Sequence, residues 1–168
     1  TYRVIAGSSS GTPRPASDPP AYAADALTQL LVARGVTVAG PAGSGDAPDG
    51  LETLVDVPSL PVSELVKEML NFSDNNTAEL LTKAVGLAAS DDPSTAAGLA
   101  QAAEVLTEAG VDMDGIALVD GSGLDPANRL TCRLLDHVLA EAGPTGPLAD
   151  GLAVADGADG TLRDRFTR

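Results

Sequence analysis

The chain is poor in aromatic and basic residues, and both shortages limit what it can be. Aromatic residues make up 2% of the 168 residues and tryptophan is absent, so a core must be built from closely packed small aliphatic side chains. The net charge is −14, which argues against nucleic acid as a partner, because such binding depends on Lys and Arg. No apolar run approaches the roughly 20 residues of a transmembrane helix. The single cysteine, Cys132, excludes an internal disulfide and is expected to be a partly buried thiol on a helix.

The spacing of apolar residues predicts an α/β chain. Helical spacing predicts helices over about 18–34, 61–71, 76–89, 94–109 and 131–142, with a last helical turn over 161–166. Alternating patterns predict strands over 1–7, 36–39, 51–57 and 116–119. We therefore expect residues 1–17 to be the end of a strand followed by a linker, and residues 18–168 to form one partial domain of helices with a few strands.

Two short motifs are the candidates for chemistry. The first is FSDNNTAELL at 72–81, a Ser-x-Asn triplet at a helix boundary, and the second is DGSGL at 120–124, a glycine-containing loop after a predicted strand. Each has an ordinary structural explanation, since Ser, Asp and Asn are favoured helix caps and glycines are favoured in turns. A dinucleotide-binding loop is excluded for the second motif, because the third glycine of that fingerprint would fall at Pro126.

In this order the two motifs resemble those of the D-alanyl-D-alanine carboxypeptidase/endopeptidase family, the class C low-molecular-mass penicillin-binding proteins. The resemblance covers most of the chain, is strongest from 72 to 131, and includes GTLRDRF at 160–166, which is similar to the family segment before a Lys-Thr-Gly strand. It implies part of a penicillin-binding, transpeptidase-like α/β domain, in which this chain supplies a helical subdomain, a few strands of an antiparallel sheet and one wall of the cleft.

The resemblance also implies an activity. The reaction would be hydrolysis of the D-Ala-D-Ala bond of peptidoglycan stem peptides, or of their cross-links, through an acyl-enzyme, with β-lactams as pseudo-substrates. It implies no cofactor and no metal, and a protein that acts outside the cytoplasm, either secreted, in the cell wall or in the periplasm.

Four residues are the candidate site. By the resemblance, Ser73 and Asn75 are catalytic: the hydroxyl relays a proton, and the amide holds the peptide group of the substrate and orients a lysine. Gly123 and Leu124 belong to the loop beside the cleft and are expected to contact the substrate. Asn128 and Thr131 continue the match and are candidate caps for the next helix.

The chain lacks two motifs that such an enzyme needs. A nucleophilic serine in Ser-x-x-Lys and a Lys-Thr-Gly strand both require a suitably placed lysine, and the only lysines are Lys67 and Lys83. Glu64 and Leu80 stand three residues before them, so no Ser-x-x-Lys forms, and neither lysine is followed by Thr-Gly. We therefore expect the nucleophile to lie in remaining segments of the same protein, and this chain alone to be inactive.

The chain departs from the family pattern after the second motif. Many family members continue with Ser-Arg, whereas this sequence has Asp125-Pro126, so an arginine at this point is not available to bind a substrate carboxylate, and Arg129 does not occupy the matching position. His137 is expected to be an ordinary helix residue, and Asp156 and Asp159 lack the spacing of a calcium loop and are expected in turns.

Two other hypotheses remain open at this stage. One is a non-catalytic domain of the same fold that binds cell-wall peptide or a partner protein. The other is an unrelated α/β binding domain in which both motifs are only caps and turns.

Overall fold

The computed structural model describes residues 16–165, which belong to two compact units divided after Val57. In the first unit the described residues form one helix, α1 (Pro19–Ala33). Asp18 caps it by accepting a hydrogen bond from the backbone N–H of Ala21, and prolines occupy its first turn, where no backbone donor is needed. The rest of this unit, 34–57, contains neither helix nor strand.

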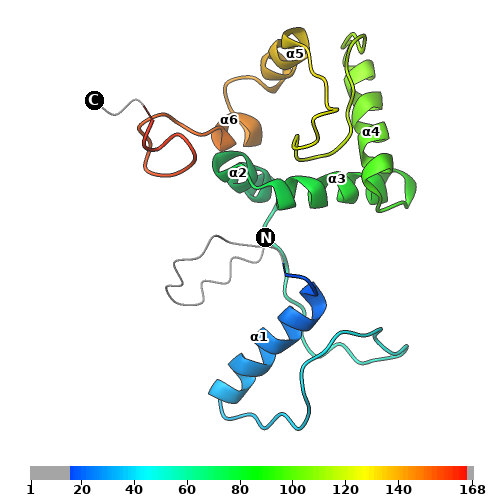
Figure 1. The fold of residues 1–168 in the computed structure, drawn as a ribbon, viewed down its shortest axis with the longest axis vertical. Coiled ribbons are helices and arrows are strands. Elements are labelled where there is room, and N and C mark those ends of the chain that lie inside the picture. The colour runs from blue at the N-terminus through cyan, green and yellow to red at the C-terminus, as the bar shows by residue number, and fades with distance from the viewer. Residues whose placement is uncertain (1–15, 166–168) are drawn as a thin grey trace. The chain divides into compact units, whose positions relative to one another are not determined.

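The second unit, from Pro58 onward, is built from five helices in its described part. They are α2 (Val62–Phe72), α3 (Asn75–Ser90), α4 (Thr95–Glu108), α5 (Cys132–Ala142) and α6 (Pro147–Gly151). Figure 1 shows α2 leading into α3, with α4 packed against α3 and the short α6 against α2. The helices predicted over 18–34, 61–71, 76–89, 94–109 and 131–142 are confirmed to within one residue at each end, whereas α6 corresponds to no predicted helix.

The α/β prediction is wrong for the residues that the structure describes. Segments 36–39 and 51–57 are not strands, and segment 116–119 contributes only an isolated bridge, in which Ala117 and Arg129 exchange two backbone hydrogen bonds of 2.9 and 2.8 Å. The reason is that an alternating pattern forms a strand only when another backbone pairs with it. Leu54 and Val57 are 91% and 81% exposed, so the pattern at 51–57 is not buried against any described residue. The strand predicted over 1–7 lies outside the described residues.

Two smaller predictions also need correction. The helical turn predicted over 161–166 is a series of hydrogen-bonded turns in its described part, not a helix. Cys132 is exposed at the first position of α5 rather than partly buried. The linker boundary proposed after residue 17 stays a prediction.

Small residues allow the closest helix packing in the second unit. A Cβ atom added to Gly86 on α3 would lie 2.6 Å from the carbonyl oxygen of Asp92 and 2.8 Å from the backbone nitrogen of Gly98 on α4, so only glycine fits there. Among the large apolar side chains of the described part, only Val111 and Leu134 are buried. The helices thus pack together through close backbone approach more than through a large apolar core. None of the described helices has the length and apolar character needed to cross a bilayer.

Candidate functional site

The Ser-x-Asn triplet lies in the tight turn between α2 and α3. Ser73 ends α2 in the left-handed conformation, with φ 53° and ψ 50°, and its backbone N–H is directed back to the carbonyl of Met69. A non-glycine residue in this conformation carries a steric cost of roughly 1–2 kcal/mol. The surrounding helices therefore hold Ser73 in a backbone geometry that it would not adopt by itself, a feature that is frequent at functional sites.

Asp74, between the two candidate residues, provides the helix cap. Its carboxylate accepts hydrogen bonds from the backbone N–H groups of Asn76 and Thr77, at 3.0 and 3.1 Å, and from the Thr77 hydroxyl at 3.1 Å. The alternative in which Ser73 or Asn75 is present only to cap α3 therefore does not describe this turn. Both are exposed, and neither side chain makes a hydrogen bond to any described residue.

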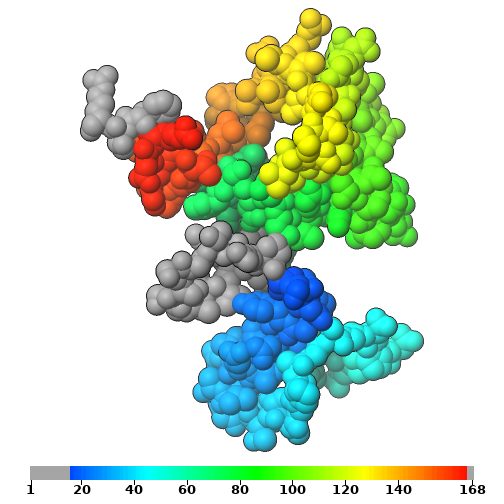
Figure 2. All heavy atoms as spheres, in the orientation of Figure 1, coloured from blue at the N-terminus to red at the C-terminus, as the bar shows by residue number. Residues whose placement is uncertain are grey.

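The second motif is bonded directly to the same helix. The backbone N–H groups of Gly121 and Ser122 both donate to Oε1 of Glu79, each at 3.0 Å, across 42 and 43 residues of sequence. Glu79 follows Asn75 by four residues on α3, so the two side chains project from the same face of the helix, one turn apart. Figure 2 shows the yellow segment that contains this loop lying on the green helices of the second unit. The two motifs are therefore neighbours.

Asp120 organises the inside of the loop. Its carboxylate accepts from the backbone N–H groups of Gly123 and Asp125, at 2.5 and 2.7 Å, and from the side-chain amide of Asn128 at 2.9 Å. Gly123 has φ +77°, a conformation that favours glycine, and it turns the chain so that the Leu124 side chain is 70% exposed. Asn128 is thus part of this loop network rather than a cap of α5, whereas Thr131 caps α5 as predicted, by accepting from the N–H of Leu134.

The pKa of the Asp120 carboxyl lies below its ordinary value of 3.8. Removal from water raises this pKa, but hydrogen bonds from Asp125, Asn128, Gly123 and Ser122 together lower it by more. Because the folded-state pKa is lowered, the stabilisation of the loop is fully present above the ordinary value and is lost as the pH falls through the lowered pKa.

We expect the amide resonances of Gly123 and Asp125 to stay constant from neutral pH down to about pH 4 and to titrate only below it. An NMR titration from pH 7 to pH 2 measures this, with Asp120→Asn as the control that should remove the titration. A midpoint above 3.8 would contradict the hydrogen-bond network.

A third segment reaches the same turn. The backbone N–H of Thr161 donates to the carbonyl of Asn71 at 3.0 Å, and Gly160, with φ +93°, lies so close to the Asn71 side chain that a Cβ would collide with it. Asn71 is the residue before Phe72 and Ser73. The segment that resembles the family region before Lys-Thr-Gly is therefore anchored two residues from Ser73.

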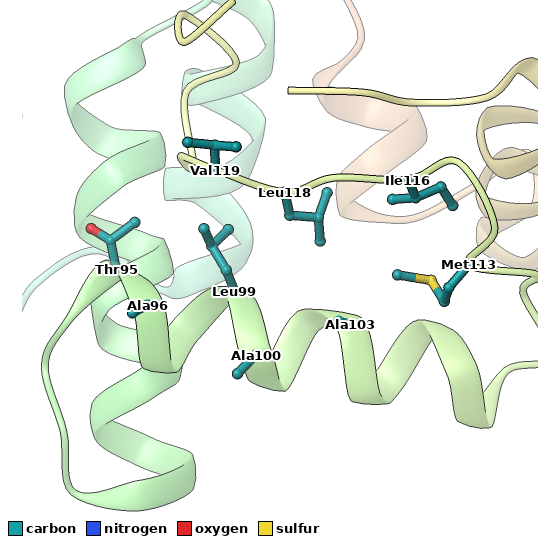
Figure 3. Close-up of a pocket in the computed structure, with 9 residues that line it drawn as sticks. All are labelled: Thr95, Ala96, Leu99, Ala100, Ala103, Met113, Ile116, Leu118 and Val119. Atoms are coloured by element: carbon teal, nitrogen blue, oxygen red, sulfur yellow. The ribbon is translucent and has the colours of Figure 1, made fainter. Parts of the chain in front are cut away.

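Two hollows in the described part of the structure lie beside these residues rather than on them. The larger, of about 710 Å³, is an apolar groove in which Leu99 on α4 and Leu118 on the facing segment point toward each other (Figure 3). The smaller, of about 180 Å³, lies along α2 and includes Asn71 and Phe72. Neither of these two hollows includes Ser73 or Asn75, which both lie on an exposed part of the described surface.

The remaining candidates do not join the site. The Arg129 guanidinium donates to the carbonyl oxygens of Pro126 and Asn128, which holds it within its own loop. Asp156 and Asp159 lie in turns, as predicted, and the described residues contain no group of three or more acidic, His or Cys side chains placed to hold a metal ion. His137 is half-buried on α5, and its Nε2 has no hydrogen-bond partner among the described residues.

Sequence reasoning missed the role of Glu79. The residue was visible as part of the 72–81 motif, and its spacing of four from Asn75 placed it on the same helix face. Its partners, however, are backbone groups more than 40 residues away. No pattern in a single sequence identifies such a pair.

Comparison with known proteins gives consistent matches over nearly the whole chain. The D-Ala-D-Ala carboxypeptidase 3 (S13) family matches residues 6–168. A D-alanyl-D-alanine carboxypeptidase of Actinomadura sp. (strain R39) is 35% identical over 164 residues, which cover 91% of this chain and 30% of that protein. A carboxypeptidase of Mycobacterium tuberculosis is 38% identical over 149 residues, covering 86% of this chain and 32% of that protein.

A solved structure matches as well. Penicillin-binding protein 4 from Haemophilus influenzae, determined in complex with a β-lactam, superposes with a TM-score of 0.69 at 26% identity. The match covers 89% of this chain and 35% of that one. The chain therefore spans about a third of the length of the relatives that it matches.

Proposed function

Because this chain belongs to the D-Ala-D-Ala carboxypeptidase 3 (S13) family, we propose that it forms one wall of the active site of a serine-type D-Ala-D-Ala carboxypeptidase. The substrates would be peptidoglycan stem peptides, or their cross-links in an endopeptidase reaction. The observation that carries the proposal is the turn at 73–75: Asp74 caps α3, which leaves the exposed Ser73 hydroxyl and Asn75 amide available for a ligand.

In this proposal Ser73 and Asn75 serve an acyl-transfer reaction. A serine attacks the amide carbonyl, a base accepts the serine proton, and the leaving nitrogen must receive a proton. The Ser73 hydroxyl, which both donates and accepts, relays that proton. The Asn75 amide donates to the carbonyl of the substrate peptide and accepts from a lysine, and its place at the first position of α3 fixes it relative to Ser73.

Gly123 and Leu124 contribute the substrate-binding side of this wall. The N–H of Gly123 is already bonded to Asp120, so the groups that remain for the substrate are the Gly123 carbonyl and the exposed Leu124 side chain. An apolar side chain beside a backbone acceptor suits a peptide that ends in small residues such as D-alanine.

The nucleophile and its lysine come from the rest of the protein. Lys67 and Lys83 belong to neither Ser-x-x-Lys nor Lys-Thr-Gly, and the chain corresponds to about a third of its relatives. The partners of this wall are therefore the remaining segments of the same protein. Action on peptidoglycan places the enzyme outside the cytoplasm, and β-lactams would acylate the same serine.

The complete protein should release D-alanine from a peptide that ends in D-Ala-D-Ala, and preincubation with a β-lactam should abolish the release. A peptide ending in L-Ala-L-Ala is the matched control, and detection of free D-alanine is the measurement. Binding of the D-Ala-D-Ala peptide without any release would favour the non-catalytic domain of the same fold and refute the proposed reaction.

A further inference from the structure

Glu79 makes two side-chain hydrogen bonds that join the first motif to the second. A single oxygen, Oε1, receives the N–H groups of Gly121 and Ser122 at 3.0 Å each. Two N–H groups bonded to one oxygen restrict both the position and the orientation of the loop. The loop is thus fixed to α3 by a side chain that is itself half-buried.

Gly121 provides a steric reason for the same contact. A Cβ on this residue would lie 2.9 Å from the carbonyl oxygen of Ala78 and would collide with the hydroxyl of Thr82. Its φ is not positive, so glycine is needed for close approach rather than for conformation. The backbone of the loop at Gly121 is therefore in close contact with α3, directly beside the residue that binds its N–H groups.

We propose that Glu79 is a positioning residue that sets the Gly123–Leu124 side of the cleft at a fixed distance from Ser73 and Asn75. This inference rests on the proposed function. Asn75 and Glu79 are one helical turn apart on a rigid helix, so any loop held by Glu79 is held relative to Asn75. Asp120 then transmits the constraint along the loop, because it directly precedes Gly121 and its carboxylate accepts from the N–H of Gly123.

The length of the side chain and the presence of an acceptor oxygen at its end determine what each substitution does. Glu79→Ala removes the acceptor. Glu79→Asp keeps the charge but shortens the side chain by one methylene group, so it should not reach both N–H groups. Glu79→Gln keeps an amide oxygen at the same position and should restore most of the geometry.

We expect Glu79→Ala and Glu79→Asp in the complete protein to raise KM for the D-Ala-D-Ala peptide about tenfold, with kcat changed by less than about threefold. The reason is that the loop binds substrate, whereas Ser73 and Asn75 keep their places on the α2–α3 turn. Glu79→Gln should have a KM within about threefold of that of the unaltered protein. Ser94→Ala, which removes the cap of α4, is the control for a general loss of stability, and it should leave KM unchanged.

Two results would overturn the proposal. One is a KM for Glu79→Ala equal to that of Ser94→Ala, and the other is a Glu79→Gln variant as impaired as Glu79→Ala. Asn75→Ala, measured beside them, separates this failure from a failure of the proposed function. If Asn75→Ala is inactive while Glu79→Ala behaves as the control, only the positioning role is refuted. If Asn75→Ala is fully active, the proposed site itself is refuted.

Discussion

A fluorescent penicillin is expected to leave the isolated 168-residue chain unlabelled and to label the complete protein. No serine of the chain has a lysine three residues later, so no hydroxyl is activated for attack on the β-lactam carbonyl. Loss of the nucleophile from a serine enzyme lowers the rate by about 10⁶-fold, which corresponds here to no detectable band.

Circular dichroism of the isolated chain is the necessary control, because an unfolded chain would also remain unlabelled. The regular secondary structure of the described residues is helical, so a folded chain should give a helical spectrum. A stable penicillin adduct on any serine of the folded chain, located by peptide mass mapping, would contradict the assignment of the nucleophile to another segment.

Asn75→Ala in the complete protein should lower the rate of penicillin acylation by roughly 10²-fold or more, as expected for removal of a positioned polar group in an acyl-transfer site. Its melting temperature should hardly change, because Asp74 carries the capping hydrogen bonds of α3 and the Asn75 side chain makes none to the described residues. Asp74→Ala, in contrast, removes these hydrogen bonds and should lower the free energy of unfolding by about 1 kcal/mol. Acylation rate and melting temperature measured on both variants distinguish a catalytic group from a cap.

The helices could be predicted because each one carries its own local information. Asp18 before two prolines and Thr131 before a polar-apolar repeat are start signals that act within a single turn, and both cap their helices in the structure. The strands could not be predicted reliably, because a strand depends on pairing with a distant segment. The alternation at 51–57 is real, but its side chains remain exposed and no described backbone pairs with it. The short helix α6 was missed because a five-residue helix contains too little periodicity to detect.

The candidate site was predictable only as far as its motifs. The order of the Ser73–Asn75 triplet and the Gly121–Leu124 loop identified the family, and in the structure the triplet lies at the start of α3 while the loop is hydrogen-bonded to Glu79 of the same helix. Asp74 rather than Ser73 caps α3 because the backbone at Ser73 has a positive φ. A positive φ at a serine cannot be predicted from the sequence. The bonds from Glu79 to Gly121 and Ser122 depend on the tertiary fold. Neither feature can be read from the sequence.

The acylation rate constants of Asn75→Ala and Asn76→Ala in the complete protein test the central claim most directly. The two asparagines are adjacent and exposed at the start of α3, but only Asn75 belongs to the Ser-x-Asn triplet. The account predicts a rate about 10²-fold lower for Asn75→Ala, and a rate for Asn76→Ala within about twofold of that of the unaltered protein. Equal rates for the two variants would contradict the placement of the active site at this turn.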